Sequence, residues 1–307
     1  GADRVWFGTE GGVSMFDGAA WKAWTQAEGV ALPEGSDAAL ERIWIIVAGA
    51  GEGTLYAGGD PGVLLESDDA GCSWTVNRGL WDHPSRPGWE PGGGGLCLHS
   101  IAPWPGDPDR LAVAVSAAGV WITEDRGVTW RRGNDGLVPR YVPEEAPEES
   151  APLCVHHLER APLRPERLFM QFHGGVYRSD DAGASWTAIA AGLPSDFGFP
   201  LALDPDDPDS AFVIPLAADT DRVTPGGRAR VYETRDAGAT WTAREALPHS
   251  DAYLTVLRLA FAQAGSGSAL ELYFGATTGE VLGSGDGGAT WFTAALHLPP
   301  VYAVQTA

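Results

Sequence analysis

The stretch "SDDAGASW", residues 179–186, has near copies at four other places in the chain. They read "SDDAGCSW" at 67–74, "TEDRGVTW" at 123–130, "TRDAGATW" at 234–241 and "SGDGGATW" at 284–291. All five fit the pattern [ST]-x-D-x-G-x-[ST]-W, called the box below, and their closing tryptophans stand 56, 56, 55 and 50 residues apart. A period of this length indicates a repeat architecture.

A weaker sixth copy, "SMFDGAAW" at 14–21, keeps Ser14, Gly18 and Trp21 but has its aspartate one position late. Six units therefore account for almost all of the 307 residues.

Each unit predicts four short strands. One unit reads "LCVHHLERAP", "RPERLFMQF", "GGVYRSD", the box at 179–186, and then "WTAIAAGLP". Apolar and β-branched runs bounded by Gly, Pro and Asp favour strands, and no segment keeps a helical period for three turns. Four antiparallel strands, repeated around a ring, form a β-propeller blade.

The two ends of the chain predict how the ring closes. "VYAVQTA" at 301–307 is typical of an inner strand without a blade, and residues 1–25 read as a blade without its inner strand. Joining them removes an open sheet edge. We therefore predict an all-β fold: one six-bladed β-propeller domain over 1–307, four antiparallel strands per blade, closed by pairing of the N- and C-terminal strands. The predicted blades are 301–307 with 1–25, 38–78, 96–133, 152–190, 198–245 and 252–295.

The box suits the hairpin between the third and fourth strands of a blade. Its Asp accepts bonds from turn N–H groups, its Gly takes a positive φ, and its Trp covers the blade. We therefore expect the box aspartates to hold turns and to take no part in chemistry.

The five boxes resemble the BNR or Asp-box repeat family, known from sialidases and from bacterial proteins labelled glycosyl hydrolase or exo-sialidase-like. The resemblance covers nearly the whole chain and implies the propeller fold. A sialidase also needs an F/Y-R-I-P motif, which is absent here. Arg140, Arg222, Arg228 and Arg258 match no sialidase motif, so sialidase activity is not expected.

The charge and composition indicate which classes of binding partner and which cell compartment to expect. With 41 acidic and 20 basic residues, the net charge of −21 argues against nucleic acid or an anionic membrane. The sequence contains no stretch of 18 apolar residues, so no membrane helix is predicted, and no signal peptide is seen. Three cysteines are typical of a reducing compartment. These features together predict a cytoplasmic protein.

Two long connections, 78–95 and 134–150, fall on the propeller face opposite the boxes. Long loops in compact domains are usually functional or disordered. Aromatic and ionisable side chains gather there, as in a pocket wall. The predicted ligand-binding residues are Trp81, Asp82, His83, Trp89, Arg140, Tyr141 and His157.

The histidines add a candidate reaction centre on the same face. His99 in "LCLHSI" and His156 in "LCVHHL" occupy equivalent inner-strand positions, and His173 falls on a turn. Histidine suits metal binding or proton transfer near neutral pH. We predict His99, His156, His173 and Glu90 as catalytic residues, and the three histidines as ligands of a divalent metal ion.

Three functions remain open from the sequence. The first is a hydrolase or lyase acting on a small molecule or sugar, metal-assisted or working through paired carboxylates, Glu90 with Asp82 or Asp196. The second is a non-catalytic propeller that binds a small-molecule or carbohydrate ligand. The third is a scaffold for a protein partner.

Overall fold

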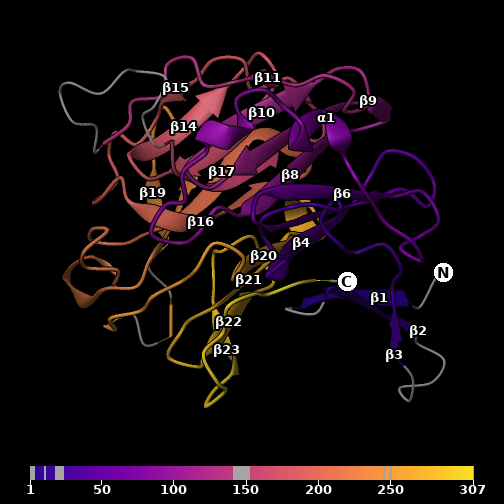
Figure 1. Ribbon diagram of the computed structural model, residues 1–307. Helices are drawn as coiled ribbons and strands as arrows, with labels where there is room; N and C mark the ends of the chain where they lie inside the picture. The colour runs from indigo at the N-terminus through magenta and orange to yellow at the C-terminus, as the bar shows by residue number, and fades with distance from the viewer. Residues whose placement is uncertain are drawn as a thin grey trace. The chain divides into compact units, whose positions relative to one another are not determined.

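The computed structural model describes residues 4–9, 12–17, 24–140, 153–244, 247–248 and 251–306. In these residues the fold is an all-β propeller with five four-stranded antiparallel blades and one further three-stranded sheet (Figure 1). Contacts divide the chain into two units, each described by itself below. Unit 1 comprises Gly1–Gly133 and Tyr141–Cys154, and unit 2 comprises Asn134–Arg140 and Val155–Ala307.

Unit 1 holds the three-stranded sheet and two blades. The sheet contains β1 (Arg4–Thr9), β2 (Gly12–Asp17) and β3 (Trp24–Gln26). The first blade contains β4 (Arg42–Ala48), β5 (Leu55–Asp60), β6 (Val63–Ser67) and β7 (Thr75–Val76). The second blade contains β8 (Leu98–Trp104), β9 (Asp107–Val115), β10 (Gly119–Thr123) and β11 (Arg131–Arg132). Between the blades lie the one-turn helix α1 (Arg78–Trp81) and the 3-10 turn η1 (Arg86–Gly88).

Unit 2 holds three blades. The first contains β12 (Val155–Arg160), β13 (Leu168–Phe172), β14 (Gly175–Ser179) and β15 (Thr187–Ala188). The second contains β16 (Gly198–Asp204), β17 (Asp207–Pro215), β18 (Val231–Thr234) and β19 (Thr242–Arg244). The third contains β20 (Phe261–Ala264), β21 (Glu271–Gly275), β22 (Val281–Ser284) and β23 (Phe292–Ala295). The 3-10 turns η3 (Pro225–Gly227) and η4 (Gly267–Ala269) connect strands within blades. In every blade the strands pair in sequence order, as expected for antiparallel hairpins.

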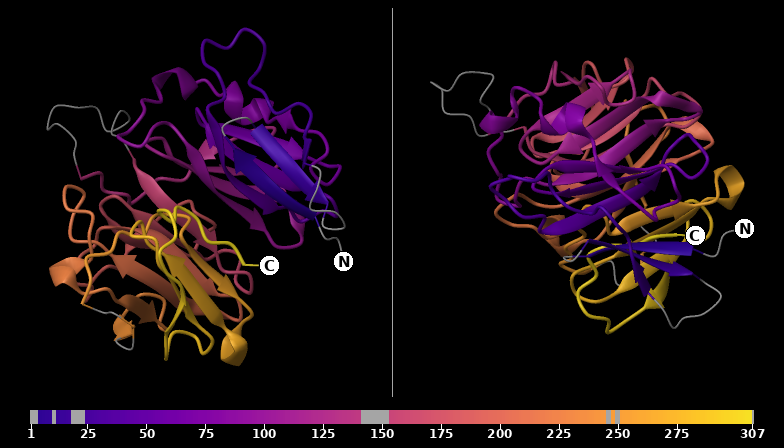
Figure 2. Two further views of the ribbon diagram at one scale, coloured as in Figure 1. Left: turned by 90° about the horizontal axis from the view of Figure 1, so that it is seen from below. Right: turned by 45° about the vertical axis from the view of Figure 1, so that its right-hand side comes forward.

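The predicted six-bladed ring, closed by residues 301–307, is wrong. The C-terminal segment stays with its own blade: Ala303 bridges Leu259, and the Val304 N–H donates to the Leu259 carbonyl over 2.8 Å. Figure 2 shows the yellow C-terminal chain running beside its own blade. Val301 fills the space above Gly275, where an added Cβ would meet its Cγ1 at 2.3 Å. Among the described residues, the N-terminal sheet has the strand order β1-β2-β3.

The box forms the hairpin between the third and fourth strands of each blade, as predicted. In the box at 179–186, Asp181 accepts the Ser179 hydroxyl (2.8 Å), the Ser185 N–H (2.8 Å) and the Ser185 hydroxyl (2.5 Å). The Gly183 N–H donates to Ser179 Oγ, and Gly183 has φ +93°. The other four boxes repeat these bonds. The weak sixth copy closes at Gly18 and Trp21, which lie outside the described residues.

The box turn and the turn between the first two strands share one end of each blade. The Ala182 N–H donates to the Glu166 carbonyl over 2.8 Å, and the Ala237 N–H to the Asp209 carbonyl over 2.9 Å. The second-to-third-strand turns therefore lie at the opposite ends. Two links between blades begin at the box end instead, because Asp135 bridges Ser185 of the next box and the Trp130 indole N–H donates to Asn77 Oδ1 over 3.0 Å.

Replacing Asp181 by alanine is expected to lower the free energy of unfolding by about 1–2 kcal/mol, because a turn anchor with three donors is lost. Urea unfolding followed by circular dichroism measures this change. Ligand binding by the folded variant is expected to be unchanged. A variant of normal stability that no longer bound ligand would contradict a structural role for the box.

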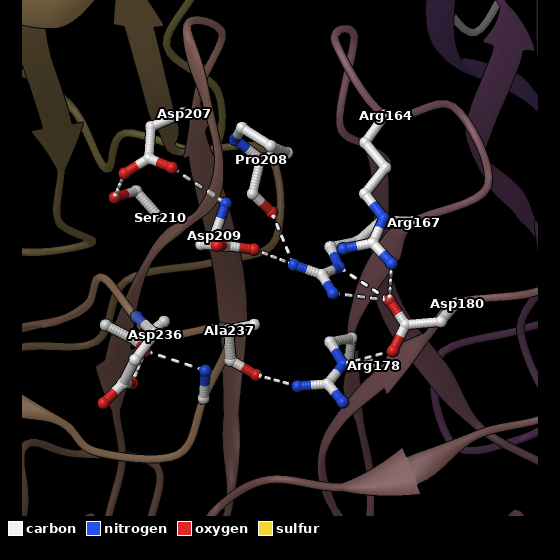
Figure 3. A network of polar contacts seen from close by, with 12 residues as sticks. Arg164, Arg167, Arg178, Asp180, Asp207, Pro208, Asp209, Ser210, Asp236 and Ala237 are labelled. Atoms are coloured by element: carbon white, nitrogen blue, oxygen red, sulfur yellow. Dashed lines mark hydrogen bonds and ion pairs between the residues drawn. The ribbon is translucent and has the colours of Figure 1, made fainter.

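A buried arginine joins two blades of unit 2 at the box end (Figure 3). Arg167 is 5% exposed, and its Nε donates to Asp180 over 2.7 Å. Its Nη1 reaches Asp209 of the next blade. Arg178 binds Asp180 over 2.9 Å and the Ala237 carbonyl over 2.5 Å. Polar contacts at this end therefore serve to hold neighbouring blades together.

Within the described part of the chain, the helices are all too short to cross a membrane.

Candidate functional site

At the end opposite the boxes, unit 2 brings together two histidines, two phenylalanines, two arginines and one aspartate. We call this group the His156 cluster. Its members are His156, His173, Phe197, Phe199, Asp219, Arg222 and Arg258.

Irregular strand pairing places the two central rings. The ladder between β12 and β13 shifts between Val155 and His157, so His156 is the inserted residue. The ladder between β16 and β17 shifts between Gly198 and Leu201, next to Phe199. A bulge turns one side chain out of the regular alternation and is frequent beside functional sites. The same shift occurs at Trp44 in β4 and at His99 in β8.

The rings pack as an aromatic group. The His156 ring lies 4.6 Å from Phe199, 5.4 Å from Phe197 and 5.2 Å from His173, measured between centroids. His156 Nδ1 lies 2.6 Å from the Gly198 carbonyl oxygen. Because a carbonyl only accepts, Nδ1 carries the proton and donates, which leaves Nε2 as the basic nitrogen of the neutral ring.

Burial keeps His156 neutral. Loss of hydration lowers the pKa of His156 to about 3, against the bond to Gly198, which favours the charged form. Arg258, His173 and Arg222 lower this pKa further through their positive charge. His156 is therefore a fixed, uncharged wall of the cluster at neutral pH.

His173 lies at the β13–β14 turn and faces a carboxylate. Its Nε2 is 3.6 Å from Asp219 Oδ2, and its side chain is 20% exposed. Partial burial lowers the pKa of His173, and Asp219 acts in the opposite direction. The turn is braced by buried Gln171, whose amide donates to the Gly175 and Asp196 carbonyls over 3.2 and 3.0 Å.

Two guanidinium groups flank the Phe199 ring. The Cζ atom of Arg222 is 5.4 Å from the ring centroid, and that of Arg258 is 5.9 Å from it. The Arg222 Nε donates to the Asp219 carbonyl over 3.0 Å, which fixes the arginine beside the histidine pair. Arg140 binds Asp196 in the same unit and adds positive potential near His173.

His157 lies next to the cluster and positions one of its arginines. Its Nδ1 is 2.6 Å from the Arg258 carbonyl oxygen, and its Nε2 is 3.0 Å from Glu159 Oε1. His157 thus ties β12 to the segment that carries Arg258.

In unit 1 the predicted wall residues of the 78–95 loop pack against the blade. Trp89 is 8% exposed, with its ring centroid 4.9 Å from that of Trp121, and His83 lies 4.6 Å from the same ring. Arg86 stacks 3.8 Å over Trp81 and donates to the Pro61 and Gly62 carbonyls over 2.9 and 2.8 Å.

The remaining predicted site residues lie apart from such a group. His99, also in unit 1, is fully buried, with Nδ1 2.9 Å from Ser100 Oγ. Asp82 is bound to Arg78 over 2.7 Å, and Glu90 is exposed. Tyr141 lies outside the described residues. Of the predicted catalytic residues, the structure brings together His156 and His173.

A metal centre finds no support in the described residues. They contain no group of three His, Cys, Asp or Glu side chains able to hold a metal ion. Of the three expected ligands, His99 belongs to unit 1, whereas His156 and His173 belong to unit 2. The positive charges of Arg258 and Arg222, which lower the pKa of His156, also repel a cation there, although Asp219 lies 3.6 Å from His173.

Sequence reasoning missed Phe199 and Asp219 and assigned no role to Arg222 and Arg258. Asp219 and Arg222 lie in a long connection between the second and third strands of their blade, β17 and β18. The link from His156 to Phe199 spans two blades, and no periodic pattern in the sequence marks it.

Comparisons with solved structures agree with the fold. A GH74 xyloglucanase from Xanthomonas campestris aligns with a TM-score of 0.67 at 19% identity, over 95% of this chain and 43% of that one. An ancestral GH74 enzyme aligns with a TM-score of 0.63 at 17% identity, over 92% of this chain and 34% of that one. A structure of YCF48 bound to D1 peptide aligns with a TM-score of 0.39 at 16% identity, over 82% of this chain and 80% of that one.

This chain thus spans less than half the length of the two GH74 chains. No family model matches the sequence, and no curated protein matches it. At these identities the similarity shows a shared propeller fold, and function has to be argued from the site.

Proposed function

We propose that the protein binds a small anionic ligand, carboxylated or phosphorylated, at the His156 cluster of unit 2. The observation that supports this proposal is the pair of guanidinium groups of Arg222 and Arg258 on the Phe199 ring. Arginine binds carboxylates and phosphates through paired N–H donors. The clustering stands out in a chain that has 41 acidic and only 20 basic residues.

The buried aromatic rings support the two arginines from below. Phe197 and Phe199 are 1% and 5% exposed, so they form a firm base and not an open surface. Neutral His156 contributes a ring without adding charge. An acidic sugar is a suitable ligand, because its carboxylate pairs with arginine.

Isothermal titration calorimetry with D-glucuronate and inorganic phosphate tests the proposal. We expect Arg222→Gln to weaken binding about tenfold, because one charge-assisted contact is lost. Arg131→Gln is the matched control, since Arg131 is an exposed arginine on β11 of unit 1. Equal binding by wild type and Arg222→Gln, or no binding of either anion, would overturn the proposal.

A hydrolase or lyase is the second candidate, favoured by the His173–Asp219 pair. A histidine of lowered pKa is neutral at pH 7 and accepts a proton, and Asp219 stabilises the imidazolium that results. Turnover of a bound acidic sugar derivative that is lost in His173→Gln, with binding retained, would support catalysis. Binding without turnover in the wild type would leave the non-catalytic function.

A further inference from the structure

Unit 2 contains a pocket of about 240 Å³ whose lining shares no residue with the His156 cluster. It is lined by Pro194, Pro215, Pro225, Arg228, Arg230 and Tyr232. This volume suits a ligand with a single ring, since pockets for drug-sized molecules start at about 300 Å³.

Strand alternation builds the charged side of the pocket. Arg228, Arg230 and Tyr232 are spaced by two residues along the chain that enters β18, so their side chains point to one face. The intervening Ala229 and Val231 are 1% and 0% exposed and join the hydrophobic core. The pattern therefore commits two guanidinium groups and a phenol ring to the same surface.

Three proline rings form the other walls. Each proline has a fixed φ and no N–H, so these walls change little when a ligand binds. The turn at Pro225 is also pinned: the Thr224 hydroxyl donates to the Ala252 carbonyl over 2.6 Å, and the Thr224 N–H donates to the Leu254 carbonyl over 3.0 Å. A preformed pocket loses little conformational entropy on binding, which favours affinity for a small ligand.

The charge of the lining selects the ligand. Neither Asp nor Glu is among the six residues that line the pocket, although acidic residues outnumber basic ones twofold in the chain. Proline rings and a tyrosine ring offer flat apolar contacts to a ring, and arginine pairs with a carboxylate. We propose that this pocket, called the proline pocket, binds a monocyclic carboxylate, with the carboxylate at Arg228 and the ring between Tyr232 and the prolines.

The test uses the full chain labelled with 3-fluorotyrosine, because Tyr232 then reports on this pocket alone. Comparison with Tyr232→Phe identifies its ¹⁹F signal among the seven tyrosines. We expect D-glucuronate or benzoate to shift this signal. The compound that causes the larger shift shows whether the pocket prefers a sugar acid or an aromatic acid. D-glucose, which lacks the carboxylate, is expected to leave the signal unchanged.

Arg228→Gln is expected to weaken the response at least tenfold, whereas Arg131→Gln is expected to keep it within twofold. Arg222→Gln, which disrupts the His156 cluster, is expected to leave the Tyr232 response intact, so failure of either proposal is seen separately. The proposal is overturned by an equal response in Arg228→Gln, by an equal response to D-glucose, or by no shift with either carboxylate at 10 mM, about the weakest affinity of interest.

Discussion

Replacing Trp121 by alanine is expected to lower the free energy of unfolding of unit 1 by about 3–5 kcal/mol. Trp121 lies on β10, is fully buried, and donates from its indole N–H to the Ala118 carbonyl over 3.0 Å. Its ring also contacts Trp89 and His83 of the 78–95 loop. Removal leaves a large cavity, and the loop loses its apolar support.

Urea unfolding followed by far-ultraviolet circular dichroism measures the effect. This signal is preferred to fluorescence, because the variant lacks one of the tryptophans that fluoresce. Trp104→Ala is the matched control, since Trp104 is half-buried at the end of β8 and its loss leaves a smaller cavity. We expect Trp104→Ala to cost less than half as much. A Trp121 variant as stable as the control would mean that the loop does not depend on this packing.

The 78–95 loop shows why sequence alone could not separate a binding wall from a packed connection. Its mixture of aromatic and ionisable residues fits both. Trp121, against which His83 and Trp89 pack, lies more than 30 residues further along the chain. Arg86 donates to two backbone carbonyls and stacks on the Trp81 ring. A ligand-binding role for Trp81, Asp82, His83 and Trp89 stays a prediction.

The box turns were predictable because their interactions are local. Asp181 binds residues two positions before it and four positions after it, so the octapeptide contains its own explanation. Ring closure was not predictable, because it depends on which blade residues 301–307 join. Val301 fits Gly275 and Val304 binds Leu259, and neither contact leaves a pattern in the sequence.

The candidate site was predictable only where it depends on positions that the repeat itself defines. The sequence predicted equivalent inner-strand positions for His99 and His156 and a turn position for His173, and the structure has a shift of the strand ladder at both His99 and His156. Phe199 and Arg258 come from other blades, 43 and 102 positions beyond His156. Only the three-dimensional structure joins them to the histidines.

Lowering the pH from about 6.5 to 4.5 is expected to destabilise the protein by about 2–3 kcal/mol through His156, at about 1.4 kcal/mol per pH unit. The pKa of His156 is about 3 in the folded state, below the value near 6.5 of an unfolded histidine. Between these values the unfolded chain binds the extra proton, so stability falls as the pH falls and this loss levels off below about pH 3. Urea unfolding at several pH values gives the slope.

His156→Gln should flatten this slope, because glutamine does not titrate and its amide still donates to the Gly198 carbonyl. The window above pH 4.5 separates His156 from the boxes: bonds from the Ser73 N–H and hydroxyl hold the pKa of Asp69 at about 2, so box aspartates affect stability only as the pH falls below about 4.5. His173→Gln is the comparison, and we expect a smaller change, since His173 is partly exposed and faces Asp219. An unchanged slope in His156→Gln would mean that His156 is hydrated and free to take up a proton, and the uncharged wall of the anion site would have to be abandoned.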